Sequence, residues 1–325
     1  MSESSLLSSS QASELAQGLA QELRKAVIGQ DAVIDEVLTA LIAGGHVLLE
    51  GVPGLGKTLL VRALSRCFGG EFARIQFTPD LMPSDVTGHA VFDLQSEQFK
   101  LRRGPVFTHL LLADEINRAP AKTQAALLEA MQERQVTLEG RALPLPQPFL
   151  VMATQNPIEQ EGTYPLPEAE LDRFMLKVRM SYPGAEQELA MVRKISASSR
   201  ADMLDVQPLR QLLSATEVVA LQTVASQLPV DDHVLDYAVR IARATREWPG
   251  LAIGAGPRAS IALLRCARAQ ALLHGAGFVT PDDIKRCALA VLRHRVRLSA
   301  ELEIDGLDTD QVLRQMLEQI PAPRR

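Results

Sequence analysis

The residues with the clearest chemical meaning lie in the glycine-rich segment 51–58. Its sequence, Gly-Val-Pro-Gly-Leu-Gly-Lys-Thr, is a complete G-x-x-x-x-G-K-[ST] loop. Glycines let backbone N–H groups curl around phosphate oxygens, and a helix that follows directs its positive N-terminal end at the same anion. Lys57 has the length to reach the β- and γ-phosphates, and the Thr58 hydroxyl is a ligand for Mg²⁺. The loop therefore predicts binding of a nucleoside triphosphate.

Two carboxylates, Asp114 and Glu115, form the second group of residues with chemical meaning. They follow the apolar run 109–113, which has the composition of a buried β-strand. Ligands of open α/β sheets gather at the carboxyl ends of the strands, so we expect both side chains beside the phosphates. There Asp114 would hold Mg²⁺, directly or through water, and Glu115 would polarise the attacking water. Many strands end in acids, and it is the combination with the 51–58 loop that makes this pair informative.

A polar amide, Asn156, follows another apolar run, 149–153, and precedes Pro157. At the end of a strand in the same sheet, it could orient the attacking water or sense the γ-phosphate. An asparagine before a proline is also an ordinary turn residue. The residues alone leave both interpretations open.

These side chains need a sheet to position them, and the first half of the chain predicts one. Apolar runs alternate there with helix-compatible stretches, a pattern typical of a parallel sheet covered by helices on both faces. The candidate strands are His46–Glu50, Phe72–Phe77, His109–Ala113, Phe149–Ala153 and Phe174–Val178. We therefore predict an α/β nucleotide-binding domain over residues 13–183.

The second half of the chain, residues 184–325, predicts a separate helical domain, because helix periodicity replaces the strand signals. The clearest helix start is Thr280, an N-cap type followed by proline and two aspartates. Apolar residues then recur on one helix face at Ile284, Cys287, Ala288, Val291 and Leu292.

Two segments interrupt the α/β pattern and predict β-hairpins. Within residues 84–107, alternation around Phe99 indicates a hairpin strand that ends at Gly104. Within residues 135–145, the runs Gln135–Leu138 and Ala142–Leu145 flank a Glu-Gly-Arg turn. Such projections are more than a minimal nucleotide-hydrolysing domain needs.

Composition narrows the classes of protein to consider. The chain has 325 residues, which suggests about two domains, with 46% hydrophobic and 22% charged residues. A net charge of −5 and only 4% aromatic residues give no sign of a nucleic-acid surface. No apolar run approaches the ~20 residues of a membrane helix, so we expect a cytoplasmic protein. The serine-rich residues 1–12 predict a disordered tail, and the three cysteines lack metal-ligand spacing, which favours core positions.

The combined motifs resemble those of AAA+ ATPases, and specifically of the MoxR family, over nearly the whole chain. The segments that carry the resemblance are Val27–Gln30, Gly51–Thr58 (Walker A), Leu112–Ala119 (Walker B), Leu127–Thr137, Ala153–Pro157 (sensor 1), Glu170–Phe174 (arginine finger) and Gly254–Ala259 (sensor 2). One departure is Gly256, where the family usually has serine, and this difference leaves Arg258 in place.

The resemblance implies a fold and a set of site residues. The implied fold is a P-loop AAA+ domain, with a central parallel five-stranded sheet in the order 5-1-4-3-2, followed by a helical lid domain. ATP contacts are implied for Ile28, Gly29, Gly51, Pro53, Gly54, Leu55, Gly56, Lys57, Thr58 and Leu59. Mg²⁺ ligation is implied for Thr58 and Asp114, and catalytic roles for Glu115, Asn156, Arg173 and Arg258.

The resemblance also implies an assembly and a kind of activity. It implies a homo-oligomer, a hexameric ring with ATP at the subunit interfaces, in which Arg173 reaches the γ-phosphate of a neighbour. Residues 84–107 would be an insert in helix two and residues 135–145 the hairpin before sensor 1, both facing the ring pore. The implied activity is ATP hydrolysis that remodels or activates a partner protein, often one with a von Willebrand factor A domain.

Other functions stay open from the sequence. A metal-chelatase motor subunit would share the pore hairpins. A nucleotide-gated scaffold with little hydrolysis is disfavoured by the presence of Glu115, and a nucleic-acid motor is disfavoured by the acidic balance of the chain.

Several arginines also have more than one interpretation. Arg173 could form a local pair with Asp172 instead of reaching a neighbour. Arg118 and Arg134 are weaker candidates for a subunit interface. Solvated or salt-bridged surface positions are expected for Arg102, Arg103, Arg293, Arg295 and Arg297.

Overall fold

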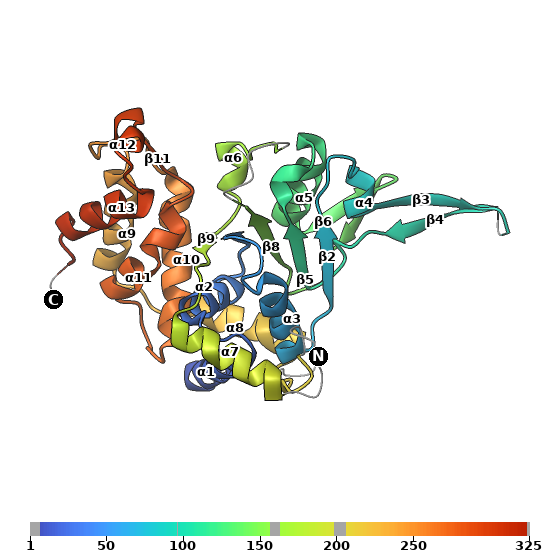
Figure 1. The fold of residues 1–325 in the computed structure, drawn as a ribbon, viewed down its shortest axis with the longest axis horizontal. Helices are drawn as coiled ribbons and strands as arrows, with labels where there is room; N and C mark the ends of the chain where they lie inside the picture. Colours follow the sequence, from blue (N-terminus) through green and yellow to red (C-terminus); the bar gives the residue numbers. More distant parts are fainter. Residues whose placement is uncertain (1–6, 96, 157–162, 198–205, 324–325) are drawn as a thin grey trace.

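The computed structural model describes residues 7–95, 97–156, 163–197 and 206–323. At its centre lies a five-stranded sheet with the order β2-β5-β8-β1-β9, in which all neighbouring strands are parallel (Figure 1). Its strands are β1 (Val47–Glu50), β2 (Phe72–Gln76), β5 (Leu110–Asp114), β8 (Leu150–Gln155) and β9 (Leu176–Arg179). Counted along the chain, they lie in the order 5-1-4-3-2, which confirms the predicted topology.

Helices cover both faces of the sheet because successive side chains of a strand point to opposite sides. One face packs against α2 (Asp31–Ile42) and α3 (Lys57–Phe68), and α1 (Ser9–Ala26) packs on these two helices. The other face packs against α5 (Ala121–Glu133), which follows the short 3₁₀ helix η1 (Ile116–Arg118). Within β1, Leu49 belongs to the first core and Leu48 to the second. This two-sided burial is why the inner strands β1, β5 and β8 are mostly apolar. The edge strands β2 and β9 also carry charged residues.

The helical domain lies beside the sheet, next to β9 (Figure 1). Its helices are α8 (Ala215–Gln227), α9 (Asp232–Ala244), α10 (Pro257–Leu273), α11 (Pro281–Leu292), α12 (Ala300–Ile304) and α13 (Thr309–Gln319). The predicted start of α11 is confirmed, since the Thr280 side chain accepts a hydrogen bond from the Asp283 N–H in a capping box. Helix α7 (Ala185–Ala197) connects the two domains along the chain.

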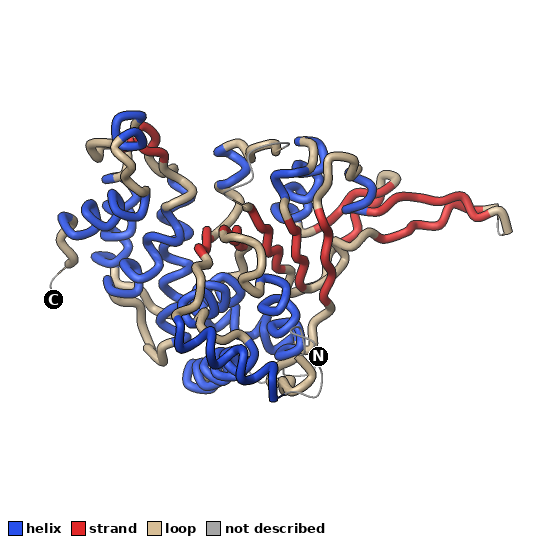
Figure 2. Tube along the Cα trace, in the orientation of Figure 1, coloured by secondary structure: helices blue, strands red, loops and turns tan. Residues whose placement is uncertain are grey.

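Short strands complete the fold. A small antiparallel pair in the helical domain, β10 (Leu251–Ile253) and β11 (Arg297–Leu298), was not indicated by the helix periodicity. The two predicted hairpins are present, with strands β3 (Gly88–Asp93), β4 (Gln98–Arg103), β6 (Gln135–Leu138) and β7 (Arg141–Pro144). The β3–β4 hairpin follows α4 (Pro83–Thr87) and projects as an arm, drawn in red at the right of Figure 2.

The expected disordered tail over residues 1–12 needs correction. Helix α1 begins at Ser9, and Ser8 and Gln11 form a capping box at its start, so residues 9–12 are helical. The apolar residues of α1 that pack on the core explain this, since burial of an amphipathic face stabilises a helix whose propensity alone is modest. Residues 1–6 lie outside the described part of the chain.

The expected surface position of Arg293 and Arg295 is wrong. Their side chains are only 7% and 4% exposed, because they pair inside the domain interface with Asp310 and Asp172 respectively. The three cysteines are buried and unbonded, which confirms the predicted core positions. In the described ranges no helix is both long and apolar enough to cross a membrane.

Candidate functional site

The glycine-rich loop connects the end of β1 to the start of α3. Gly54 and Gly56 have φ values of +87° and +81°, which side chains other than glycine rarely adopt. A Cβ atom added at either position would meet nothing within 4 Å, so the space above the loop is open. Helix α3 begins at Lys57 directly after Gly56, and its N-terminal N–H groups therefore border that space. An open cradle at a helix N-terminus fits a phosphate group.

Lys57 contributes a cation to this cradle. Its ammonium group donates a hydrogen bond to the Gly51 carbonyl at 2.5 Å, across the loop. Burial lowers the pKa of Lys57, and the nearby carboxylates of Asp114 and Glu115 oppose that shift. The lysine is thus held between the loop backbone and the acidic ends of the sheet.

The remaining loop residues differ in how far they are buried. Leu55 is buried in the core with α3, and Leu59 packs partly against the same core. Pro53 is exposed, and Thr58 lies half-buried in the first turn of α3. Thr58 therefore lies in the first helical turn after the loop, and its hydroxyl is the ligand that the sequence predicts for Mg²⁺.

Asp114 ends β5 at the same edge of the sheet and makes two strong contacts. Its Oδ1 accepts a hydrogen bond from the Thr154 hydroxyl at 2.6 Å, and its Oδ2 pairs with Arg74 at 2.6 Å. A carboxylate has about four lone-pair sites, so both oxygens can still accept a water or a cation. The hard oxygens of Asp114 and Thr58 suit Mg²⁺, and together with the open cradle they fit a Mg²⁺–nucleotide complex.

Glu115 has a backbone conformation that is uncommon outside glycine, with φ at +56°. Its N–H donates to the Thr154 hydroxyl at 2.8 Å, and its Oε2 accepts from Gln76 at 2.7 Å and from Arg118 at 3.1 Å. The side chain remains 25% exposed. Strained backbone that is fixed by several contacts is typical of functional positions.

Asn156 follows the end of β8, and since β8 lies between β1 and β5, this residue belongs to the same sheet edge. Pro157, the last residue of the predicted motif, lies outside the described residues. The turn that contains Ile28 and Gly29 lies beside this edge too. A Cβ on Gly29 would meet Pro183 at 3.0 Å, while one on Gly51 would meet Met180 at 2.9 Å. The turn and the loop therefore contact the same short segment after β9.

Arg173 and Arg258 are not part of this group. Both line a cavity together with His46 and Met175, which directly precede β1 and β9. That is the amino-terminal edge of the sheet, whereas the loop follows the carboxyl end of β1. The four residues of β1 lie between them, roughly 13 Å at about 3.3 Å per residue. Within one subunit, these arginines and the phosphate cradle lie on opposite edges.

The local pair considered for Arg173 is not what the structure contains. Asp172 pairs with Arg295 at 2.7 Å and lies 3.8 Å from Arg258. Arg173 donates instead to the Leu128 carbonyl at 2.9 Å. Its guanidinium is therefore not neutralised by its neighbour in sequence.

Three residues at the phosphate edge were not singled out in the sequence. Arg74 and Gln76 lie on β2 and contact Asp114 and Glu115, and Thr154 on β8 contacts both acids. The rule that parallel strands place their carboxyl ends together could have indicated Gln76 and Thr154. Nothing in the spacing of Arg74 distinguishes it from other strand arginines.

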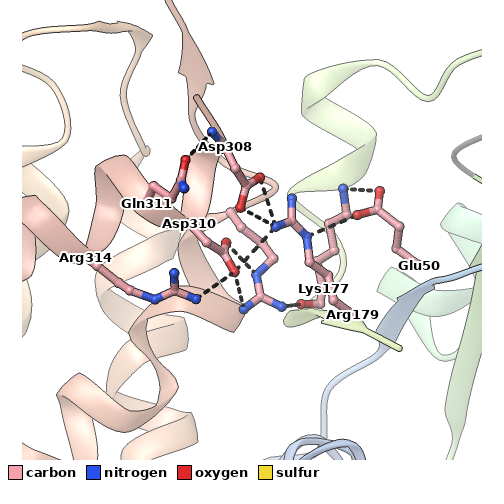
Figure 3. Close-up of polar contacts among 8 residues, drawn as sticks. Glu50, Lys177, Arg179, Asp308, Asp310, Gln311 and Arg314 are labelled. Atoms are coloured by element: carbon pink, nitrogen blue, oxygen red, sulfur yellow. Dashed lines mark hydrogen bonds and ion pairs between the residues drawn. The ribbon is translucent and has the colours of Figure 1, made fainter. Parts of the chain in front are cut away.

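A polar network connects this edge to the helical domain (Figure 3). Glu50, the last residue of β1 before the loop, pairs with Lys177 at 2.5 Å and Arg179 at 3.3 Å. Arg179 also pairs with Asp308 at 2.8 Å and lies 3.5 Å from Asp310, at the start of α13. The helical domain is thus tied to the strand that carries the loop.

Comparison with known proteins places this geometry in a family. Residues 46–176 match the family model of the ATPase family associated with various cellular activities (AAA), and residues 243–316 match the AAA lid domain. The chain is 43% identical over 303 residues to the uncharacterised protein YeaC of Bacillus subtilis, covering 93% of each chain. It is also 43% identical over 312 residues to Chaperone MoxR1 of Mycobacterium tuberculosis, covering 93% of this chain and 81% of the relative.

The chain belongs to the MoxR family of AAA+ ATPases. A crystal structure from Cytophaga hutchinsonii, of a protein described provisionally as an ATPase, has the same fold. It is 40% identical, superposes with a TM-score of 0.89, and the match covers 97% of each chain. In this AAA+ chain, the AAA match contains the glycine-rich loop, Asp114, Glu115 and Arg173, and the lid match contains Arg258.

Proposed function

We propose that this MoxR-family chain hydrolyses ATP at a site composed of two subunits of a ring, and uses the reaction to remodel or activate partner proteins. The observation that supports this most is the separation of Arg173 and Arg258 from the phosphate cradle of their own subunit. A second copy that presents its arginine edge to the cradle would complete the site, and repetition of this head-to-tail contact closes a ring.

In this proposal the residues of one subunit bind and orient the nucleotide. The backbone N–H groups of the loop and Lys57 bind the phosphates, and the turn at Ile28 and Gly29 lies against the base. Thr58 and Asp114 hold Mg²⁺, which when bound neutralises charge on the phosphates. Thr154 orients both Asp114 and Glu115 through its hydroxyl.

Glu115 is the general base in this proposal and Asn156 positions the attacking water. The base must accept a proton from water beside the γ-phosphate, and Glu115 lies at that edge with a partly exposed carboxylate. The neighbouring subunit contributes Arg173, whose charge stabilises the transition state. Arg258 comes from the same cavity and adds a second cation to the same phosphates.

The names of the relatives and the projecting arm support the proposed biological role. One relative is named as a chaperone. The β3–β4 arm exposes Phe92, Leu94 and Phe99, with exposed fractions of 47%, 84% and 73%. Exposed aromatic residues on a projection support contact with a protein. We propose a hexameric cytoplasmic ring whose pore contains these arms, and a partner with a von Willebrand factor A domain. A metal-chelatase motor remains the competing role.

The proposal is tested by measuring phosphate release from Mg²⁺–ATP over a range of protein concentrations. Because the site needs two copies, the activity per subunit should rise steeply as the protein assembles. Glu115→Gln should bind ATP normally but release at least about a hundredfold less phosphate. Glu133→Gln, which changes an exposed carboxylate on α5, is the matched control.

Two results would contradict the proposal. Wild-type protein that binds ATP but releases no phosphate at any concentration would indicate a nucleotide-gated scaffold. Activity per subunit that is the same in demonstrated monomers and in assemblies would exclude a site shared between copies.

A further inference from the structure

The cavity at the amino-terminal edge of the sheet is unusually rich in arginine. Its volume is about 270 Å³, and it lies between the sheet and helix α10 of the lid domain. Among the described residues, Asp172 is the only acidic residue in its lining. The arginines that line it are Arg134, Arg173, Arg258, Arg265 and Arg295. The lining also contains His46, whose pKa burial lowers to about 4, so that this ring is neutral at pH 7.

The single carboxylate of the cavity is already shared. Asp172 pairs with the buried Arg295 at 2.7 Å and lies 3.8 Å from Arg258. The other three arginines of the lining contact backbone carbonyls. Carbonyl oxygens accept hydrogen bonds but carry no net charge, so the cavity keeps an excess of positive charge within the described part of the chain.

Two of these arginines donate hydrogen bonds to the same carbonyl oxygen. Arg134, at the end of α5, and Arg265, on α10, both donate to the Gly44 carbonyl, at 3.3 Å and 3.2 Å. Arg265 also donates to the Ala43 carbonyl at 2.5 Å. Both side chains are exposed to solvent at the mouth of the cavity. One cation would suffice to cap the last carbonyls of α2, and the second cation at the same oxygen repels the first although it also donates a hydrogen bond.

Helix α10 presents Arg265 on the same side as Arg258. The two residues are seven positions apart, which is about two helical turns, and both line the cavity. The four exposed or half-exposed arginines therefore converge from α5, the segment before β9, and α10. This arrangement suits an anion with several oxygens, since guanidinium groups bind phosphate in a planar, two-pronged geometry.

The size of the cavity limits the anion. Pockets for drug-sized ligands usually occupy about 300–1,000 Å³, and this cavity is smaller. It is large enough for the phosphate end of a nucleotide. The end of a triphosphate that projects from another protein surface meets this description.

We propose that Arg265 and Arg134 bind the triphosphate carried by the loop of a second copy of this chain, beside Arg173 and Arg258. This inference rests on the proposed two-subunit site and adds two catalytic residues to it. Arg265 reaches the neighbour's phosphates from the lid, so the position of the lid in one subunit controls hydrolysis in the next.

The test compares Arg265→Met with Arg268→Met. Arg268 lies one turn further along α10 and also donates to a backbone carbonyl, that of Leu228, but it does not line the cavity. Hydrogen bonds to charged groups are worth enough to change a rate by about 10- to 100-fold. Arg265→Met should lower kcat by that factor in assembled protein at saturating ATP, and Arg268→Met should leave it within about twofold. Both variants should bind ATP in their own loops like the wild type.

Mixing subunits distinguishes an Arg265 that only caps α2 in its own subunit from an Arg265 that binds the triphosphate of a neighbour. Arg265→Met mixed with Lys57→Ala should regain activity, because some interfaces then combine an intact loop with an intact Arg265. A fold defect inside the Arg265→Met subunit could not be rescued by its neighbour. If Arg265→Met melts at a lower temperature than the wild type, Arg265→Lys provides a second variant, because lysine keeps the charge and the cap. Its expected loss of kcat is smaller than that of Arg265→Met.

Three outcomes would overturn the inference. The first is an equal kcat for Arg265→Met and Arg268→Met, measured beside wild-type protein that hydrolyses ATP. This result would remove Arg265 from the site but would not contradict the two-subunit site itself. The second is a loss of activity in Arg265→Met that no mixture restores despite demonstrated subunit exchange. The third is binding of inorganic phosphate by Lys57→Ala subunits that an added Arg265→Met change abolishes, while Arg265→Met alone hydrolyses ATP like the wild type. That result would assign the cavity to a free anion.

Discussion

At the scale of single residues, the acidic edge of the sheet is fixed by one hydroxyl. Thr154 accepts the Glu115 N–H at 2.8 Å and donates to Asp114 at 2.6 Å. It therefore sets the direction of two carboxylates with different proposed roles, one on the cation and one on the attacking water. The contact also supports the left-handed backbone of Glu115.

Replacement of this hydroxyl should slow the reaction without weakening nucleotide binding. Thr154→Val keeps the shape of the side chain and removes both hydrogen bonds, and such bonds to charged groups are worth about 1.5–3 kcal/mol each. We expect kcat to fall about 10- to 100-fold, with an unchanged dissociation constant for ATP. Thr137→Val on the exposed side of β6 is the control. A loss of ATP affinity as large as the loss in kcat would show that Thr154 supports the glycine-rich loop and does not orient Asp114 and Glu115.

Glu36 on α2 provides a pH prediction. Burial raises its pKa from the ordinary 4.5 to about 7, Arg293 opposes this shift and Asp310 adds to it. Between these two pKa values the folded chain holds a proton that the unfolded chain has lost, so the free energy of unfolding falls as pH rises through this window. Glu36→Gln should remove that dependence and stabilise the protein at pH 8 by at most roughly 3 kcal/mol. Urea unfolding at pH 5 and pH 8 measures the effect, and an unchanged pH dependence would contradict it.

Sequence reasoning succeeded at this scale where a motif fixes both residue type and position. It located Lys57, Thr58, Asp114 and Glu115, and the structure places these at one sheet edge. It missed Arg74, Gln76 and Thr154 because their contacts depend on which strands are adjacent in the sheet. It missed the shared carbonyl of Arg134 and Arg265 because that contact joins two domains.

At the scale of elements, periodicity predicted the strands well and the domain interface poorly. Each strand of the five-stranded sheet lies within two residues of its predicted bounds, because the inner strands are continuous apolar runs and the edge strands still carry apolar residues at alternate positions. The burial of Arg295 could not be predicted, since a charged residue at the end of α11 looks the same whether it meets water or Asp172. The start of α1 was missed because a serine-rich segment resembles a tail until its apolar side finds a core.

The projecting arm gives a prediction for partner contact. Phe99 on β4 is 73% exposed and its ring packs edge-on against Phe92 with centroids 5.2 Å apart. Phe99→Ala should therefore cost little stability and leave basal ATPase activity within about twofold, while activity stimulated by a partner or substrate falls at least about tenfold, as for an interface hot spot. His89→Ala near the base of the arm is a control. Equal loss of basal and stimulated activity would make the arm a structural element.

The polar network at the domain interface gives a stability prediction (Figure 3). Asp310 and Arg293 are 6% and 7% exposed and form a two-pronged pair with distances of 3.0 Å and 3.1 Å. Removal of one partner from a buried pair costs about 3–5 kcal/mol, so Asp310→Asn should lower the free energy of unfolding by about that amount. Asp308→Asn, whose side chain is 45% exposed in its pair with Arg179, should cost less than about 1 kcal/mol. Equal losses in urea unfolding would contradict this difference.

At the scale of the whole molecule, the fold divides its chemistry between two edges of one sheet. The phosphate cradle and the acids lie at the carboxyl edge, and an arginine cavity lies at the amino edge beside the lid. In the proposed mechanism neither edge alone is a complete ATPase site, so the protein would act only as an assembly. The lid contacts both edges, the cradle through the ion pairs of Glu50 and the cavity through α10.

The ATPase activity of mixed assemblies shows whether the site is shared between two subunits. Arg173→Ala subunits keep an intact loop, and Lys57→Ala subunits keep an intact arginine edge. Each variant alone should be inactive, since an arginine supplied in trans is worth about 10³–10⁵ in rate. Mixed in equal amounts, about a quarter of head-to-tail interfaces combine both intact edges, so the account predicts recovery of roughly that share of wild-type activity. No recovery at any ratio, with subunit exchange demonstrated, would contradict it.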